Sequence, residues 1–295
     1  MRIAVMGAGE FGSHFGYALL KAGQDVTLIA RGRRYDEIAR DGVRGKWEAN
    51  VIPPDAFTVT RDPAAVGPVD AVIFAVKTYQ LEEAAEQIAP LIGEDTVVIP
   101  LQNGVTAGER LAGIVERRHV LEYATSTPHA IGELGGPVTP RVEAMRSVLA
   151  SAGFDVAAAD DIRVPLWQKL VQYAALSTGL AARADLGQTA TSPELRKLVR
   201  EGAEEAAKVA AAEGIPIEPG AGESVLAFLD EQKGSPWRSS MLKDLEAGRP
   251  LELEDLIGHV VNRGGERGIS TPVLRVCYLM LKPFAQGALP PGGRR

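Results

Sequence analysis

A lysine stands near the start of an otherwise apolar helical stretch, LWQKLVQYAALSTG at residues 166–179. On a period of 3.6 residues, Lys169, Tyr173 and Ser177 form a polar stripe along one face of that helix. An ammonium group is costly to remove from water, so its position among apolar residues needs a reason. The helix alone leaves two interpretations open. Lys169 is either a partly desolvated group that serves chemistry, or a side chain that reaches solvent from the rim of a core helix.

A glycine-rich loop at the other end of the chain predicts a dinucleotide site. The sequence IAVMGAGEFG places G-x-G-x-x-G directly after a short apolar run and at the start of a helical stretch. In that setting the glycines let the backbone approach a pyrophosphate, and the helix N-terminus supplies amide donors. The alternative is a tight strand-to-helix turn without a ligand. The predicted cofactor-binding residues of the loop are Gly7, Ala8, Gly9, Glu10, Phe11 and Gly12.

The residue after the second expected strand predicts which dinucleotide binds. That strand ends at Ala30, and Arg31 follows where an NAD site usually has an acidic residue. A guanidinium pairs with a ribose 2′-phosphate, whereas a carboxylate would accept from the 2′-hydroxyl. We therefore expect NADP(H) as the cofactor. Arg33 and Arg34 of the same segment are interpreted as a solvated basic loop.

Two polar residues follow further expected strands. Lys77 comes after VIFAV and Asn103 after VVIPLQ. Ligands of open α/β sheets bind outside the carboxyl ends of the strands, so both residues are predicted to lie at the cofactor site.

The elements that must position these residues divide into two kinds. Strands are expected at 2–6, 25–30, 69–76 and 96–101, with helical stretches between them, and this alternation predicts a doubly wound parallel sheet. Later strands are expected within 119–126 and 154–158, with a Gly/Pro-rich hairpin near 132–140. After about residue 161, five stretches are all helical by spacing. The prediction is an α/β N-terminal Rossmann-type domain, residues 1–162, followed by an all-α C-terminal domain, residues 163–295.

Composition excludes several classes of protein. A net charge of -6 argues against a nucleic-acid binder. The chain lacks an apolar run long enough to span a membrane, and its first residues are too short an apolar stretch for a signal peptide. Its single cysteine, Cys277, cannot form an intrachain disulfide and is expected in the core. No spacing typical of a metal site is present. The expected location is the cytoplasm.

The arrangement resembles the 2-dehydropantoate 2-reductase (ketopantoate reductase) family over nearly the whole chain. The resemblance rests on GAGEFG, VKTYQ, LQNG, DDIRVPLWQKL, SSMLKDLEAGRPLELEDLIG and RGGERGISTPV. It implies an N-terminal Rossmann domain, a helical C-terminal domain and an active site in the cleft between them. The implied reaction is NADPH-dependent reduction of a 2-oxo acid to a 2-hydroxy acid, with 2-dehydropantoate as the first candidate.

The resemblance also implies roles for individual residues. Lys169 matches the family's catalytic lysine, which would stabilise and protonate the oxygen of the reduced ketone. Ser240 matches the substrate-binding serine, and Glu252, twelve positions later, matches a glutamate that holds the ammonium or a cofactor hydroxyl. Lys77 and Asn103 match cofactor contacts, and Asn103 also matches a substrate contact.

Two predicted substrate contacts depart from the family pattern. Tyr173 and Ser177 stand where characterised ketopantoate reductases have asparagines. Two alternatives therefore stay open: a family reductase of a different 2-oxo acid or imine, and a non-catalytic NADP(H)-binding sensor. A homodimer is expected by analogy with family members.

Overall fold

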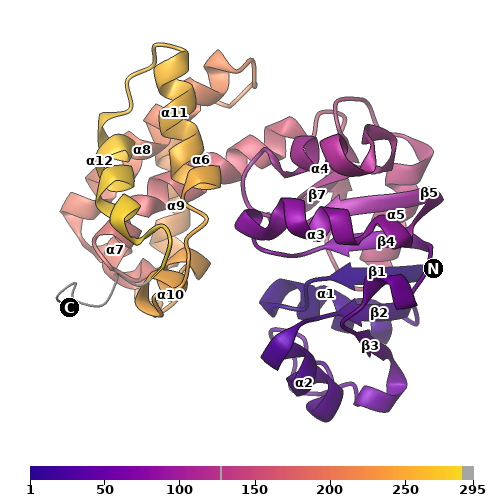
Figure 1. Ribbon diagram of the computed structural model, residues 1–295. Coiled ribbons are helices and arrows are strands. Elements are labelled where there is room, and N and C mark those ends of the chain that lie inside the picture. The colour runs from indigo at the N-terminus through magenta and orange to yellow at the C-terminus, as the bar shows by residue number, and fades with distance from the viewer. Residues whose placement is uncertain (127, 288–295) are drawn as a thin grey trace. The chain divides into compact units, whose positions relative to one another are not determined.

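The chain divides into two compact units, Met1–Pro165 and Leu166–Arg295. The computed structural model describes residues 1–126 and 128–287 (Figure 1). The division falls in helix α6 (Arg163–Ala181), whose first residue is also the first residue of the expected second domain.

A five-stranded parallel sheet forms the centre of the first unit. Its order is β3-β2-β1-β4-β5, and each neighbouring pair is parallel. Strands β2 and β3 lie on one side of β1, and β4 and β5 lie on the other. The strand order therefore reverses between β1 and β4, and sheets of this kind bind ligands at that switch point. The strands are β1 (Arg2–Met6), β2 (Asp25–Ile29), β3 (Thr58–Thr60), β4 (Val69–Phe74) and β5 (Ile92–Pro100).

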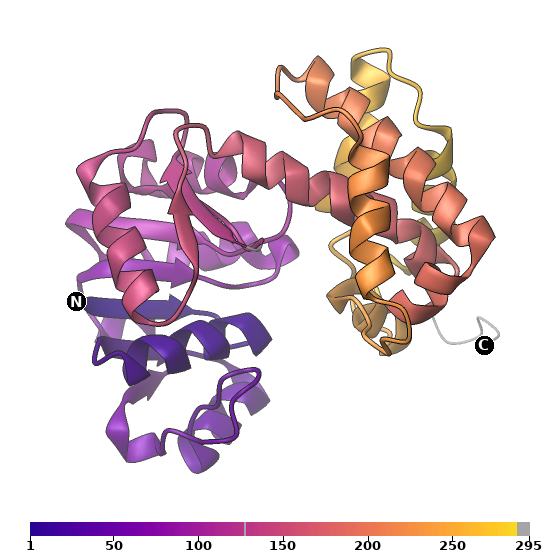
Figure 2. The ribbon, with the colours of Figure 1, turned by 180° about the vertical axis from the view of Figure 1, so that it is seen from behind.

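Helices cover both faces of this sheet, which explains why its central strands β1 and β4 are apolar apart from Arg2 and Asp70 near their starts. Ile3 and Val5 of β1 pack into one core, and Ala4 and Met6 pack into the other. Figure 1 shows α3 and α4 over one face, and the view from behind in Figure 2 shows α1 and α5 over the other. The helices are α1 (Glu10–Lys21), α2 (Gly32–Asp41), α3 (Leu81–Gln87), α4 (Ala107–Val115) and α5 (Pro140–Ser151). The predicted Rossmann-type fold is confirmed.

A second, three-stranded sheet corrects one expectation. Strands β6 (Leu121–Ala124) and β7 (His129–Glu133) are antiparallel, and β7 pairs in parallel with β8 (Val156–Ala158). The predicted hairpin near 132–140 is therefore wrong, because the chain reverses between β6 and β7. The glycines and prolines of 135–140 instead lead into α5, where Pro140 occupies the first helical turn.

The second unit is helical, as predicted. After α6 its helices are α7 (Leu186–Thr191), α8 (Pro193–Ala212), α9 (Ala221–Glu231), α10 (Ser240–Glu246), α11 (His259–Glu266) and α12 (Pro272–Leu281), and a short 3₁₀ turn, η7 (Lys282–Phe284), follows α12. A π-helical turn, η6 (Glu254–Gly258), precedes α11 and was not expected. Cys277 is buried, as expected. Within the described residues, no helix has the length and apolar character needed to cross a membrane.

Candidate active site

The glycine loop forms a close-packed turn between β1 and α1. Gly7 has a φ of 96°, a conformation that favours glycine. A Cβ on Gly12 would lie 1.9 Å from the carbonyl oxygen of Gly7, so the first turn of α1 contacts the loop only because residue 12 is glycine. The first and third glycines are thus required by the fold itself.

Gly9 differs, because the described protein atoms do not require a glycine there. Apart from Gly9 and its two chain neighbours, no heavy atom of the described residues lies within 4 Å of the position a Cβ would take. Gly9 is the N-cap of α1 and lines a cavity of about 210 Å³ together with Gly7, Ala8 and Arg31. An uncrowded glycine at a helix N-terminus fits a pyrophosphate that approaches the backbone closely.

Substituting Gly9 with alanine tests this distinction. We expect Gly9→Ala to leave the melting temperature unchanged and to weaken NADPH binding by about tenfold or more, because the methyl group would fill space that the pyrophosphate needs. The measurement is calorimetric titration alongside thermal unfolding. Gly113→Ala in α4 is the matched control, since a Cβ there also meets no atom of the described chain. Equal NADPH affinity in the two variants would contradict the assignment.

Glu10 and Phe11 open α1, and their side chains contact Lys46. The Glu10 carboxylate pairs with the Lys46 ammonium at 2.5 Å, and that ammonium lies 4.8 Å from the centre of the Phe11 ring. Their contribution to cofactor binding stays a prediction, and the groups available for it are the backbone N–H groups of the first helical turn.

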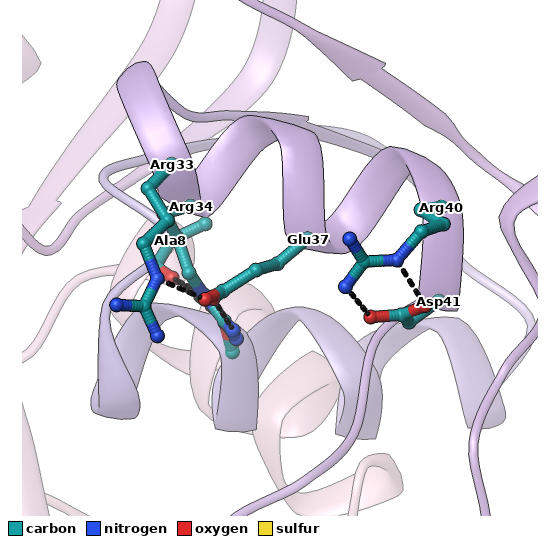
Figure 3. A network of polar contacts seen from close by, with 7 residues as sticks. Ala8, Arg33, Arg34, Glu37, Arg40 and Asp41 are labelled. Carbon is teal, nitrogen blue, oxygen red and sulfur yellow. Dashed lines mark hydrogen bonds and ion pairs between the residues drawn. The ribbon is translucent and has the colours of Figure 1, made fainter.

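Arg34 contacts the glycine loop directly, which the sequence interpretation missed. Its guanidinium donates to the carbonyl oxygen of Ala8 and to Ser13 Oγ, both at 2.8 Å, and pairs with Glu37 (Figure 3). Arg34 also lines the cavity beside Gly9. The expected loop is wrong for both residues, because they lie in α2. The expected exposure to solvent is met by Arg33, whose side chain is 91% exposed, and not by Arg34.

Lys77 and Asn103 lie where the sequence predicted, at the carboxyl ends of neighbouring strands. The Gln102 amide ties the two strand ends together, because Nε2 donates to the carbonyl oxygens of Phe74 and Val76 at 3.1 and 2.8 Å. Gln102 is a positioning residue that the sequence reasoning did not single out. Its only signal was its place between a strand and Asn103. Lys77 and Asn103 are both partly buried.

Lys169 is buried in the helical unit, with 8% of its surface exposed. Burial lowers the pKa of its ammonium group to about 8, and the nearby charge of Glu252 opposes that shift. The nitrogen lies 5.3 Å from the centre of the Tyr173 ring, one helical turn on. The alternative of a lysine that reaches solvent is therefore wrong.

The Glu252 carboxylate is positioned by a well-fixed segment ahead of the π-helical turn. The Arg249 guanidinium binds the buried Asp244 at 2.8 Å, and the Leu251 N–H donates to the carbonyl oxygen of Ala285 at 2.9 Å. Glu252 itself is buried. Glu254, two residues on, instead binds the Tyr278 hydroxyl and Lys282 in an exposed cluster. The two glutamates of the LELE segment thus have separate environments.

The two predicted serines are placed differently. Ser177 is buried, and its hydroxyl donates to the carbonyl oxygen of Ala174 and also interacts with Cys277 on α12. This arrangement uses the Ser177 hydroxyl inside the helical core and gives no support to a substrate contact. Ser240 begins α10 and is partly exposed. The capping hydroxyl of that helix belongs to Ser239, which accepts from the Leu242 N–H at 3.1 Å. A substrate-binding role for Ser240 stays a prediction.

Each unit therefore carries one group of predicted residues. The first unit has a glycine loop with two arginines at the switch point of a parallel sheet, and the second has a buried lysine with a glutamate and a tyrosine. Among residues 1–126 and 128–287, no cluster of His, Cys, Asp and Glu could hold a metal ion. A Rossmann-type unit with such a loop, joined to a helical unit with a buried ammonium group, defines a two-domain nicotinamide-dependent oxidoreductase.

Comparisons with known proteins identify the family within that class. Residues 3–139 match the family model described as ketopantoate reductase PanE/ApbA, and residues 161–285 match the model of its C-terminal part. The chain belongs to the ketopantoate reductase family and is an NADP-dependent oxidoreductase. The predicted family and cofactor are confirmed.

Individual relatives agree with this family over nearly their full length. The chain is 30% identical to a 2-dehydropantoate 2-reductase of Archaeoglobus fulgidus, with 97% of this chain and 98% of the relative covered. It is 27% identical to the solved 2-dehydropantoate 2-reductase of Geobacter metallireducens, with a TM-score of 0.87 and coverage of 96% and 99%. A D-mandelate dehydrogenase solved with NADH and anilino(oxo)acetate shares the fold, at 22% identity, a TM-score of 0.85 and coverage of 97% and 98%.

Proposed function

We propose that this protein reduces a 2-oxo acid to the 2-hydroxy acid with NADPH, and that 2-dehydropantoate is its substrate. The choice of substrate is supported by the relatives named 2-dehydropantoate 2-reductase. In this proposal residues 1–162 bind the cofactor, and residues 163–295 supply the proton and most of the substrate contacts. The expected homodimer remains a prediction of this proposal, as does the absence of nucleic-acid partners.

The buried Lys169 ammonium is the observation that carries the proposal. When bound, NADPH supplies the hydride that adds to the carbonyl carbon. Negative charge then develops on the carbonyl oxygen, and Lys169 stabilises that charge and transfers its proton to give the hydroxyl group. A pKa of about 8 suits this role, because the group is mostly protonated near neutral pH and releases its proton more readily than an ordinary lysine.

Glu252 supports the same step through its charge, and it also stays a predicted cofactor contact. Its buried negative charge raises the pKa of Lys169 against the effect of burial, so the lysine stays an acid at neutral pH. For substrate recognition we propose Asn103, Tyr173 and Ser240. Lys77, Asn103 and the residues of the glycine loop hold the cofactor, with Arg31 facing the 2′-phosphate.

Tyr173 favours a second candidate, a family reductase of a different 2-oxo acid. An aromatic ring 5.3 Å from the Lys169 nitrogen gives the catalytic group an apolar neighbour where the resemblance implies an amide. Because Tyr173 offers a ring and a single hydroxyl in place of an amide, the site would select a substrate with more apolar surface beside its carbonyl group than 2-dehydropantoate has.

A panel of 2-oxo acids tests the proposal by loss of NADPH absorbance, with 2-dehydropantoate and aromatic 2-oxo acids included. We expect the highest kcat/KM with 2-dehydropantoate, and a higher value with an aromatic acid would favour the second candidate. Turnover that requires an added amine would instead indicate imine reduction. Tight NADPH binding without turnover of any member would contradict a reductase and favour a cofactor-binding sensor.

A further inference from the structure

Arg31, the arginine predicted to bind the 2′-phosphate, forms an ion pair with a carboxylate from a distant part of the chain. Arg31 follows β2, and its guanidinium donates to Glu83 of α3, 52 positions later, at 2.9 Å. Both side chains line the cavity that contains Gly7, Ala8 and Gly9. The pair is about half exposed, at 51% for Arg31 and 67% for Glu83, so both side chains can exchange partners in solution.

Glu83 carries its negative charge at neutral pH. The hydrogen bond and charge of Arg31 lower the pKa of the Glu83 carboxyl group, and a hydrogen bond from Gln87 lowers it further. Arg34, the other arginine that lines this cavity, is also paired with a carboxylate, that of Glu37. The cavity therefore does not present two uncompensated positive charges to a ligand.

These charges act differently on the two nicotinamide cofactors. A 2′-phosphate that binds Arg31 either displaces the Glu83 carboxylate or binds the guanidinium beside it, and in both cases it lies close to a negative charge. An unphosphorylated ribose has no charge to be repelled, and its 2′-hydroxyl can donate to a carboxylate. Glu83 thus opposes the phosphate and does not oppose the hydroxyl.

We propose that Glu83 is a specificity-determining residue that narrows the preference of this protein for NADP(H) over NAD(H). The inference rests on the proposed binding of the cofactor in the cavity beside Arg31. It adds Glu83 as a residue that reduces the difference in affinity between NADP(H) and NAD(H). It predicts that the protein also binds NADH, with an affinity closer to that for NADPH than Arg31 alone would give.

Two small probes test the proposal without turnover. Adenosine 2′,5′-bisphosphate and 5′-AMP differ only in the 2′-phosphate, and their affinities are measured by calorimetry. We expect Glu83→Gln to bind the bisphosphate about three- to fivefold more tightly than wild type, and 5′-AMP no more tightly. The gain should shrink at high salt, because the interaction is between exposed charges.

Glu82→Gln is the matched control. Glu82 precedes Glu83 in α3 and is also paired with an arginine, Arg110, at 2.7 Å, but it does not line the cavity. We expect wild-type affinities for both probes in this variant. If both probes bind and the ratio of their affinities is the same in wild type and Glu83→Gln, this inference is overturned while the cofactor site stands. If wild type binds neither probe, the proposed cofactor site fails and the inference fails with it.

Discussion

Replacing Lys169 with alanine is expected to lower kcat for 2-oxo acid reduction by about 10²- to 10⁴-fold, the usual contribution of a positioned acid. The buried ammonium is the proposed proton donor, and alanine removes both the proton and the positive charge. NADPH binding should stay within about twofold of wild type, because the glycine loop and Arg31 belong to the other unit. The measurements are steady-state kinetics with the best substrate of the panel and calorimetric titration of NADPH.

Lys197→Ala is the control for this prediction. Lys197 lies on α8 in the same unit, and its side chain is 76% exposed in an ion pair with Glu201. Its loss should change kcat by less than about twofold, since exposed ion pairs contribute little. A kcat near the wild-type value in Lys169→Ala, with folding intact by circular dichroism, would contradict the proposed role of the lysine.

The pH dependence of the reduction provides the second large effect. Only the protonated Lys169 can donate a proton, and its pKa is about 8, so kcat should be constant at low pH and fall about tenfold per pH unit well above that value. Glu252→Gln removes the charge that raises this pKa and leaves burial to lower it. The midpoint should therefore move to lower pH, by about one unit or more, with a rate loss of about fivefold or more at pH 8.

Glu254→Gln is the control that separates the effect of the Glu252 charge on Lys169 from a general structural change in the LELE segment. Glu254 is an exposed carboxylate two residues away that binds Tyr278 and Lys282, so its substitution should leave the midpoint unchanged. The decisive quantity is the midpoint of the kcat profile and not the rate alone, because a merely structural role of Glu252 would lower the rate at every pH. An identical midpoint in Glu252→Gln and wild type would show that Glu252 does not act on Lys169.

The fold was predictable from local patterns where those patterns were strong. The apolar strands around the glycine loop and the caps of the later helices gave the correct class for both units. Strand β3 escaped notice because three residues, TVT, are too few to produce a periodic signal. The hairpin was predicted in the wrong place because the turn residues of GGPVTP, at 135–140, lead into the start of α5 at Pro140 and not into a strand.

The candidate site was predictable in its residue types and less so in its contacts. The stripe on α6 identified Lys169, but the interaction of Lys169 with Glu252 depends on a segment about eighty positions later in the chain. Arg34 looked like one member of a basic run, because nothing local shows that it reaches Ala8 across the paired strands β1 and β2. No local pattern indicated a role for Glu83, because its partner Arg31 lies 52 positions earlier in the chain.

Chemical rescue measures the proposed proton transfer most directly. In Lys169→Ala, small primary amines are added at fixed pH, and the reduction of the 2-oxo acid by NADPH is followed as a function of amine concentration and amine pKa. The proposal predicts that the rate rises with the concentration of the protonated amine and that amines too large for the space left by the lysine side chain have no effect. A rate that no amine restores, in a variant that still binds NADPH and substrate, would contradict the claim that the Lys169 ammonium supplies the proton.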